Sequence, residues 1–187
     1  MFVTEDWYFL SHRKDLVMKM LARGFRYTIG TRLGNAAEDG FAGVAVRVEH
    51  IPFKRSLASP VLDCFALFKM LVLIRRERPA IVHFVALKPI ILGIFSVLIF
   101  RKVKFVNALA GLGYIFTADS WRSGWLKSIV KLILRTSFKQ SNSHAWVQNT
   151  DDKRLLEDYL AAVNCNDVEI IPGSGIDVHK FAPDSTL

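Results

Sequence analysis

The stretch Pro79–Asn107, PAIVHFVALKPIILGIFSVLIFRKVKFVN, contains the pattern that decides the fold. Its first part, Ala80–Phe84, is a short run rich in β-branched residues, which is typical of a buried strand. The apolar segment Pro89–Phe100 is long enough for a helix, and a second strand-like run follows at Val103–Asn107. A strand, a helix and a strand in this order predict two parallel strands joined by a helical crossover.

The same alternation continues in both directions along the 187-residue chain. Further strands are predicted at Met1–Thr4, Phe25–Gly30, Val44–Val48, Ala145–Val147 and Val168–Ile171. Further helices are predicted at Ser11–Arg23, Trp121–Gln140 and Thr150–Asn164, and a long helix that follows the loop through Pro60 is predicted to end at Arg78. With 51% hydrophobic and 22% charged residues, the chain is expected to fold, and its length fits one ordinary domain. The predicted fold class is α/β, with a doubly wound, mostly parallel, Rossmann-like sheet.

The net charge of +8 indicates an anionic partner, which could be nucleic acid, an anionic membrane surface or a phosphorylated ligand. No pattern of a known nucleic-acid-binding module is present, so we expect no nucleic acid partner. No secretory signal opens the chain, and the apolar stretch Pro89–Phe100 is shorter than the ~20 residues of a membrane span. Cys64 and Cys165 fit no metal or redox spacing and are expected to be buried thiols in a reducing compartment.

In a doubly wound sheet, ligands bind where the strands end at their carboxyl side. His83 is predicted at such a strand end, and Lys88 follows closely, so the pair could supply a hydrogen-bonding group and a phosphate-binding cation. A buried histidine beside a solvated lysine would fit the same residues. His12, Arg13 and Lys14 begin a predicted helix, where a bound anion would explain three cations; a solvated basic face is the alternative.

The segment Ala110–Tyr114, AGLGY, follows a predicted strand, so the glycines Gly111 and Gly113 could let backbone N–H groups approach a phosphate. A tight turn would use the same two glycines. Phe116 stands where a dinucleotide fingerprint needs its third glycine, so no dinucleotide site is predicted. The sequence also lacks a serine elbow, a metal-ligand cluster and a closely spaced carboxylate pair, so the catalytic residues stay unknown and no metal is expected.

Between Ser120 and Thr150 the sequence contains no acidic residue. Basic side chains recur along the helix predicted there, tryptophans stand at its start, and apolar residues fill its other face. The members are Arg122, Lys127, Lys131, Arg135 and Lys139; Trp121 and Trp125; and Leu126, Ile129, Val130, Ile133, Leu134 and Phe138. A basic amphipathic helix with tryptophans at one end is typical of a membrane-surface element. The alternative is an ordinary helix that packs on the sheet and exposes a basic edge.

Several segments resemble the family 4 glycosyltransferases, which have the GT-B fold of two Rossmann-like domains. These segments are Glu5–Arg13, Val82–Pro89, Val106–Phe116, Val147–Asn149 and Ile170–Asp177, the last followed by Phe181 and Pro183. Val106–Phe116 is the most specific of them. It looks like the branch of the family that extends undecaprenyl-diphosphate-linked saccharides in the synthesis of surface polysaccharides and glycoconjugates.

The resemblance implies a retaining transferase that moves a hexose or N-acetylhexosamine from a nucleotide sugar, UDP-linked, to a polyprenyl-diphosphate-linked saccharide. Residues 1–175 would be the acceptor-binding domain, and residues 176–187 would start the linker to a missing C-terminal domain that binds the nucleotide sugar. The fragment alone would be inactive, and this domain would bind no cofactor. The lipid-linked acceptor implies a cytoplasmic enzyme, peripheral on the inner face of an anionic membrane.

The resemblance also implies roles for residues of the cleft between the two domains. Trp7, Ser11, His12 and Arg13 would lie near the acceptor or donor phosphates; His83, Lys88 and Asn107 would face the cleft; and Gly111, Gly113 and Tyr114 would shape its floor. Many family members place a histidine in the loop after the strand that here ends at Asn107. This sequence has Ala110 at or near that place, so no histidine role transfers to the loop. Two alternatives stay open: a non-catalytic, membrane-peripheral binding module, and another GT-B-like enzyme such as a sugar-nucleotide epimerase, whose catalytic acids and histidines are not evident.

Overall fold

The computed structural model describes residues 1–34, 40–54, 59–109, 124–160, 168–173 and 175. In these ranges, seven strands form one sheet in the order β3-β2-β1-β4-β5-β6-β7, and all neighbouring strands are parallel. The strands are β1 (Phe2–Glu5), β2 (Thr28–Arg32), β3 (Arg47–His50), β4 (Ile81–Val85), β5 (Lys104–Leu109), β6 (Ser143–Val147) and β7 (Val168–Ile170). The order reverses between β1 and β4, which confirms the predicted doubly wound, Rossmann-like α/β fold.

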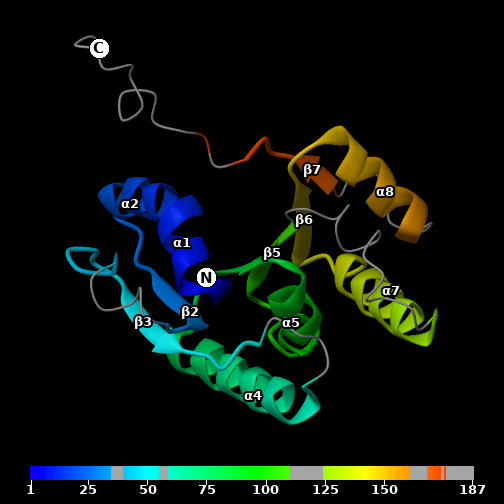
Figure 1. Ribbon diagram of the computed structural model, residues 1–187, viewed down its shortest axis with the longest axis horizontal. Helices are drawn as coiled ribbons and strands as arrows, with labels where there is room; N and C mark the ends of the chain where they lie inside the picture. Colours follow the sequence, from blue (N-terminus) through cyan, green and yellow to red (C-terminus); the bar gives the residue numbers. More distant parts are fainter. Residues whose placement is uncertain (35–39, 55–58, 110–123, 161–167, 174, 176–187) are drawn as a thin grey trace.

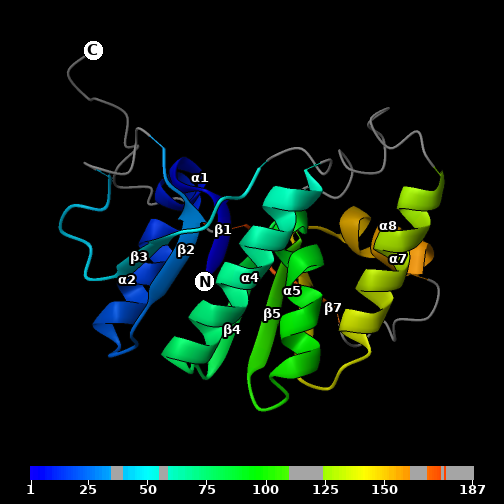
Figure 2. The same ribbon diagram turned by 90° about the horizontal axis from the view of Figure 1, so that it is seen from below.

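Helices connect the strands and lie on both faces of the sheet (Figure 1). They are α1 (Asp6–His12), α2 (Lys14–Ala22), α4 (Pro60–Glu77), α5 (Leu87–Ile99), α7 (Gly124–Phe138) and α8 (Thr150–Leu160). One hydrophobic cluster joins strand residues such as Phe84 to α4, α5 and α7, and a second joins Val3 and Val85 to α1 and α2. The helices α4, α5 and α7 therefore cover one face of the sheet, where they stand side by side (Figure 2), and α1 and α2 lie on the other.

The face under α4, α5 and α7 is tightly packed where α5 crosses β4. Phe84 of β4 stacks on Phe105 of β5, with 5.7 Å between the ring centroids. Gly93 of α5 lies directly over this ring, because a Cβ at position 93 would come within 2.4 Å of Phe84. Glycine is therefore required at this point for the backbone of the helix to approach the sheet.

Helix α5 begins at Leu87, two residues before the predicted start. The residue before it, Ala86, has φ 76° and ψ 161°, a conformation that is rare for any residue except glycine. The backbone N–H of Ala86 donates to the carbonyl of Ala108 in β5, which ties this turn to the sheet. Within the described ranges, none of the helices has the length and the apolarity that crossing a membrane would require.

The helix predicted over Ser11–Arg23 is wrong in its extent. The chain forms α1 from Asp6 onward, and a break at Arg13, with φ −125°, separates α1 from α2. The carboxylate of Asp6 accepts hydrogen bonds from the backbone N–H groups of Trp7 and of Gly34, both at 2.7 Å. This bond fastens the start of α1 to the chain after β2, a contact across 28 residues that the local sequence does not reveal.

Helix α4 packs its inward side, including Met70 and Ile74, against the sheet. Cys64 lies on its outward side and is exposed, so the prediction of a buried thiol at this position is wrong. The prediction followed from residue type, whereas α4 carries apolar residues on its outward side as well. Cys165 lies outside the described residues.

Candidate functional site

Helix α1 begins where β1 ends, so it stands at the carboxyl edge of the sheet, where ligands bind in this fold class. Trp7 is 45% exposed there, and Ser11 and His12 are also exposed. The Ser11 hydroxyl donates to the carbonyl oxygen of Trp7 at 2.7 Å and lies 2.7 Å from Nδ1 of His12. The His12 ring stacks on Tyr8, with ring centroids 4.4 Å apart. These side chains form one ordered, accessible group.

Arg13 follows this group directly, but its side chain is buried at 2% exposure. Its guanidinium carbon lies 5.3 Å from the centre of the Trp146 ring, within the range of a cation–π interaction. Burial lowers the pKa of Arg13, and a hydrogen bond with Tyr8 opposes that change. An arginine stays protonated under these conditions, so the structure keeps a positive charge beneath α1.

His83 lies in the middle of β4, so the predicted position at the end of the strand is wrong. Its ring meets the edge of the Trp146 ring at 5.1 Å between centroids, and its Nε2 atom is buried without a hydrogen-bond partner. Burial, together with the nearby charges of the Met1 amine and Arg13, lowers the pKa of His83 to about 3. His83 is therefore neutral at neutral pH and cannot serve there as a cation for phosphate.

Lys88 lies in the first turn of α5 at the carboxyl edge, yet its side chain is only 7% exposed. Its Nζ atom is 2.7 Å from Oδ1 of Asp63 in α4, so the two helices share a nearly buried ion pair. The solvated lysine that the sequence left open is thus not observed. A phosphate at this place would have to compete with Asp63 for the lysine.

Asn107, expected to face the cleft, is fully buried in β5. Its Nδ2 atom donates to Oγ of Ser143 at 2.9 Å and to the carbonyl oxygen of His144 at 3.0 Å. Asn107 lies on the same face of β5 as Phe105 and Leu109, which belong to the cluster under α4, α5 and α7. The amide therefore links β5 to β6 inside the protein, and the expectation of a surface position is wrong.

The two acids at the carboxyl edge of β1 are both engaged. Glu5 accepts hydrogen bonds from Arg32 at 2.6 and 3.0 Å, and Asp6 holds the backbone of Gly34. Among the residues that the structure describes, no three His, Cys, Asp or Glu side chains are grouped so as to hold a metal ion. The described edge thus offers aromatic, hydroxyl and imidazole groups for binding, with the charge of Arg13 buried beneath them.

Helix α7 exposes more apolar surface than its sequence predicted. Val130, Leu134 and Phe138 are buried as expected, but Ile129 is 44% exposed and therefore does not belong to the inward face. Leu132 is 64% exposed. Of the predicted membrane-facing residues, Lys131 and Arg135 are half-buried and Lys139 is exposed. The remaining predictions fall outside the described residues or side chains: Gly111, Gly113, Tyr114, Trp121, Arg122, Trp125 and Lys127.

Two residues of this region, Trp146 and Ala86, were not identified from the sequence. Trp146 contacts both Arg13 and His83, and it reaches them because β6 follows β5 and β4 in the sheet. The alternation along β6 could have placed Trp146 on one face of its strand, but not beside these partners. Ala86 carries strained backbone at the carboxyl end of β4, a position where strain of about 1–3 kcal/mol often marks a functional site.

The chain matches the family model described as "Glycosyl transferase 4-like" over residues 1–141. The match runs from β1 to just beyond the end of α7, and it includes α1, Arg13, the whole of α4, and His83. No curated protein matches the chain.

Proposed function

The chain belongs to the glycosyl transferase 4-like family, and we propose that it is the acceptor-side domain of a retaining glycosyltransferase. The enzyme moves a hexose or N-acetylhexosamine from a UDP-linked sugar to a saccharide carried on a polyprenyl diphosphate. The nucleotide sugar binds to a C-terminal domain that follows this one, and the reaction takes place in the cleft between the two. The enzyme works peripherally at the cytoplasmic face of the membrane.

The observation that carries this proposal is the ordered group on α1. An exposed indole such as Trp7 offers a flat apolar face to the C–H groups of a sugar ring, while Ser11 and His12 offer hydrogen bonds to its hydroxyls. Tyr8 connects this surface to the buried positive charge of Arg13. A neutral saccharide with a diphosphate beside it would match an aromatic and hydroxyl-bearing surface next to a fixed cation.

Chemically, such a site contributes position and electrostatics. The acceptor hydroxyl attacks the anomeric carbon on the face that the leaving diphosphate departs from, and fixed positive charge stabilises the negative charge that develops there. Glu5 and Asp6 are held in other bonds, so neither is placed here as the general base. The groups that complete the chemistry then belong to the second domain or to the acceptor and donor themselves.

The acceptor half of the proposal is tested by titrating this chain with a short-chain polyprenyl-diphosphate saccharide and following tryptophan fluorescence. Trp7→Ala and His12→Ala should each weaken binding by about tenfold, which corresponds to about 1.4 kcal/mol for one lost ring contact. Phe25→Ala is the matched control, because Phe25 is 49% exposed and lies in the loop between α2 and β2. Equal affinities for the wild type and both α1 variants would remove α1 from the site.

The transfer half needs the chain joined to a nucleotide-sugar-binding domain. We expect transfer of labelled sugar to the lipid-linked acceptor, with retention of configuration at the anomeric carbon. A joined enzyme that binds the acceptor but transfers sugar from no nucleotide sugar would favour the second candidate, a non-catalytic, membrane-peripheral binding module. The engagement of both edge acids, Glu5 and Asp6, is the observation that keeps this second candidate in view.

A further inference from the structure

The outward side of α4 presents a continuous row of large apolar side chains. Val61 is 81% exposed, Phe65 is 50% exposed, Phe68 is 61% exposed and Val72 is 46% exposed. Spacings of four, three and four residues place them on one stripe of the helix, opposite the buried Met70 and Ile74. A helix that is apolar on both sides is normally covered on both sides. In the part of the chain that the structure describes, the outward stripe is open.

The two neighbouring helices continue this surface. Helix α5 packs between α4 and α7, and the three stand side by side on one face of the sheet (Figure 2). On α5, Phe95 and Ile99 are 51% and 59% exposed, and on α7, Ile129 and Leu132 are exposed as well. We call the outward surface of α4, α5 and α7 the three-helix face. Exposed apolar area spread over three adjacent helices marks a binding surface.

The charges at the margin of the three-helix face are basic. Beyond Val72, the stripe on α4 continues into Arg75 and Arg78, and these two residues line a shallow hollow of about 360 Å³ together with Lys102. Within the described part of the chain, Arg75, Arg78 and Lys102 take part in no ion pair. A second hollow, about 680 Å³, joins Val72 to Arg75 and Arg78 directly.

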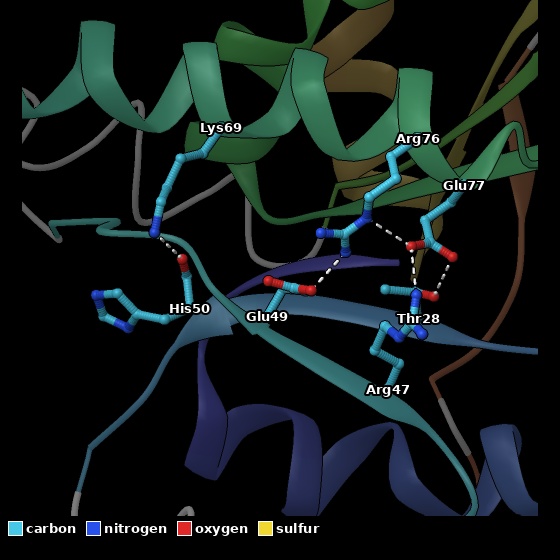
Figure 3. A network of polar contacts seen from close by, with 7 residues as sticks. All are labelled: Thr28, Arg47, Glu49, His50, Lys69, Arg76 and Glu77. Atoms are coloured by element: carbon cyan, nitrogen blue, oxygen red, sulfur yellow. Dashed lines mark hydrogen bonds and ion pairs between the residues drawn. The ribbon is translucent and has the colours of Figure 1, made fainter.

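The acids of this layer are neutralised internally, as Figure 3 shows for the carboxyl-terminal half of α4. Arg76 pairs with Glu49 of β3 and with Glu77, and Arg47 of β3 also pairs with Glu77 at 2.9 Å. Lys69 donates to the carbonyl oxygen of His50 at 2.9 Å. These bonds fix α4 against the edge strand β3 and hold the apolar stripe outward. Glu49 and Glu77 are thus engaged with Arg47 and Arg76, and not with Arg75, Arg78 or Lys102.

We propose that the three-helix face docks on a bilayer of anionic phospholipids, with Phe65 and Phe68 inserted among the acyl chains and Arg75, Arg78 and Lys102 on headgroup phosphates. Charge decides this occupant over a second copy of the chain, since two copies would bring the same unpaired cations together. Aromatic and aliphatic side chains beside lysine and arginine are also the composition of helices that lie in a membrane surface.

The direction of α4 connects this docking surface to the candidate site; this connection rests on the proposed function. Because β3 and β4 are parallel, α4 runs back from the carboxyl edge, so Val61 and Phe65 lie at the same edge as α1. A polyprenyl chain that leaves an acceptor bound at this edge could enter the bilayer beside the start of α4. The unpaired cations lie at the opposite end of the helix.

The test is sedimentation of the full chain with vesicles of phosphatidylglycerol and phosphatidylcholine, and with vesicles of phosphatidylcholine alone, at low and high salt. The wild type should bind the anionic vesicles more tightly, and added salt should weaken that binding. Phe65→Glu with Phe68→Glu should weaken it at least about tenfold, because both rings would lose their insertion. Arg75→Glu with Arg78→Glu should weaken it by about tenfold at low salt and much less at high salt.

Phe25→Glu is the control, because it places one such charge on an exposed phenylalanine outside the three-helix face, and it should bind within about twofold of the wild type. Thermal unfolding must show that the variants stay folded. Absence of binding to anionic vesicles would overturn the proposal, and so would unchanged binding by the Phe65 and Phe68 variant. If light scattering shows a dimer of the wild type that the Phe65 and Phe68 variant loses, while vesicle binding is unchanged, the face belongs to a second copy of the chain.

Titration with the short-chain, water-soluble acceptor separates this proposal from the proposed function. If Phe65→Glu with Phe68→Glu loses vesicle binding but keeps acceptor affinity, the docking surface is established independently of the site. If the wild type binds vesicles but no lipid-linked saccharide, the proposed acceptor is wrong and the docking surface stands. If it binds the acceptor but not vesicles, the docking proposal fails alone.

Discussion

Strand β4 separates two different environments. Phe84 points to the face under α4, α5 and α7, where it stacks on Phe105 among aliphatic residues. The residue before it, His83, points to the other face, where it meets Trp146 and where Arg13 lies buried. A purely apolar interior stabilises the fold, whereas a buried arginine beside an unbonded histidine costs stability. The second face thus carries a buried charged side chain beside a histidine, whereas the unusual feature of the first is its outward apolar surface.

The largest expected effect comes from the inner side of the first face. Met70→Ala should lower the free energy of unfolding by about 3 kcal/mol, because Met70 is fully buried in the core under α4. Phe68→Ala, two residues earlier on the outward side, should change it by less than about 0.5 kcal/mol. Urea unfolding of both variants measures the contrast. Similar losses for the two would mean that the outward stripe of α4 is covered by protein.

A pH titration of stability examines the second face. His83 has a pKa of about 3 in the folded chain and the ordinary value of 6.5 when unfolded, so between these values only the unfolded chain binds its proton. Stability should therefore fall as the pH is lowered from about 6.5 towards 3, and at pH 4 this group should account for about 3 kcal/mol. His83→Phe keeps a ring against Trp146 and should remove that part of the pH dependence.

Comparing unfolding at pH 7 and pH 4 for the wild type and His83→Phe measures this contribution. The other titrating groups are common to both chains, so they cancel in the difference. An identical pH dependence in the two proteins would mean that the imidazole is hydrated or bonded in the folded state, and the second face would then be less dry than its geometry indicates.

The sequence was sufficient for the fold because its signals are local. The strand-like runs and the helices between them repeat along the chain, and parallel strands joined by helical crossovers allow few arrangements. The start of α1 was misplaced because it depends on the bond from Gly34 to Asp6, which is long-range. The early start of α5 depends on the positive φ of Ala86, and this backbone conformation cannot be predicted from an alanine in the sequence.

The site was predictable only in part, for the same physical reason. Trp7, Ser11 and His12 follow β1 directly, so their place at the carboxyl edge follows from local order. His83 and Asn107 depend on partners in β6, which lie 36 or more residues further along the chain. The outward stripe of α4 went unnoticed because apolar residues on both sides of a helix indicate burial when only sequence is available.

Asn107→Ala tests whether a residue first expected in the cleft acts inside the first face. It removes two buried hydrogen bonds to β6 and should lower the free energy of unfolding by about 2 kcal/mol. Ser143→Ala should cost less, since it removes one of those bonds, and the double variant should lose less than the sum of the two. A variant that loses acceptor affinity while keeping its stability would return Asn107 to the binding site.

The smallest effect expected is on α7, where charge and apolar area contribute to the same outward surface. Lys131→Gln with Arg135→Gln should weaken binding to anionic vesicles by about fivefold, or about 1 kcal/mol, because both side chains are half-buried and only part of their charge faces outward. Sedimentation at low salt, beside the Phe65 and Phe68 variant, measures the two contributions on one scale. A larger loss from the α7 variant would mean that charge on α7, and not insertion from α4, dominates docking. The two faces of the sheet would then differ only in their buried side chains, and the apolar stripe of α4 would bind something other than the bilayer.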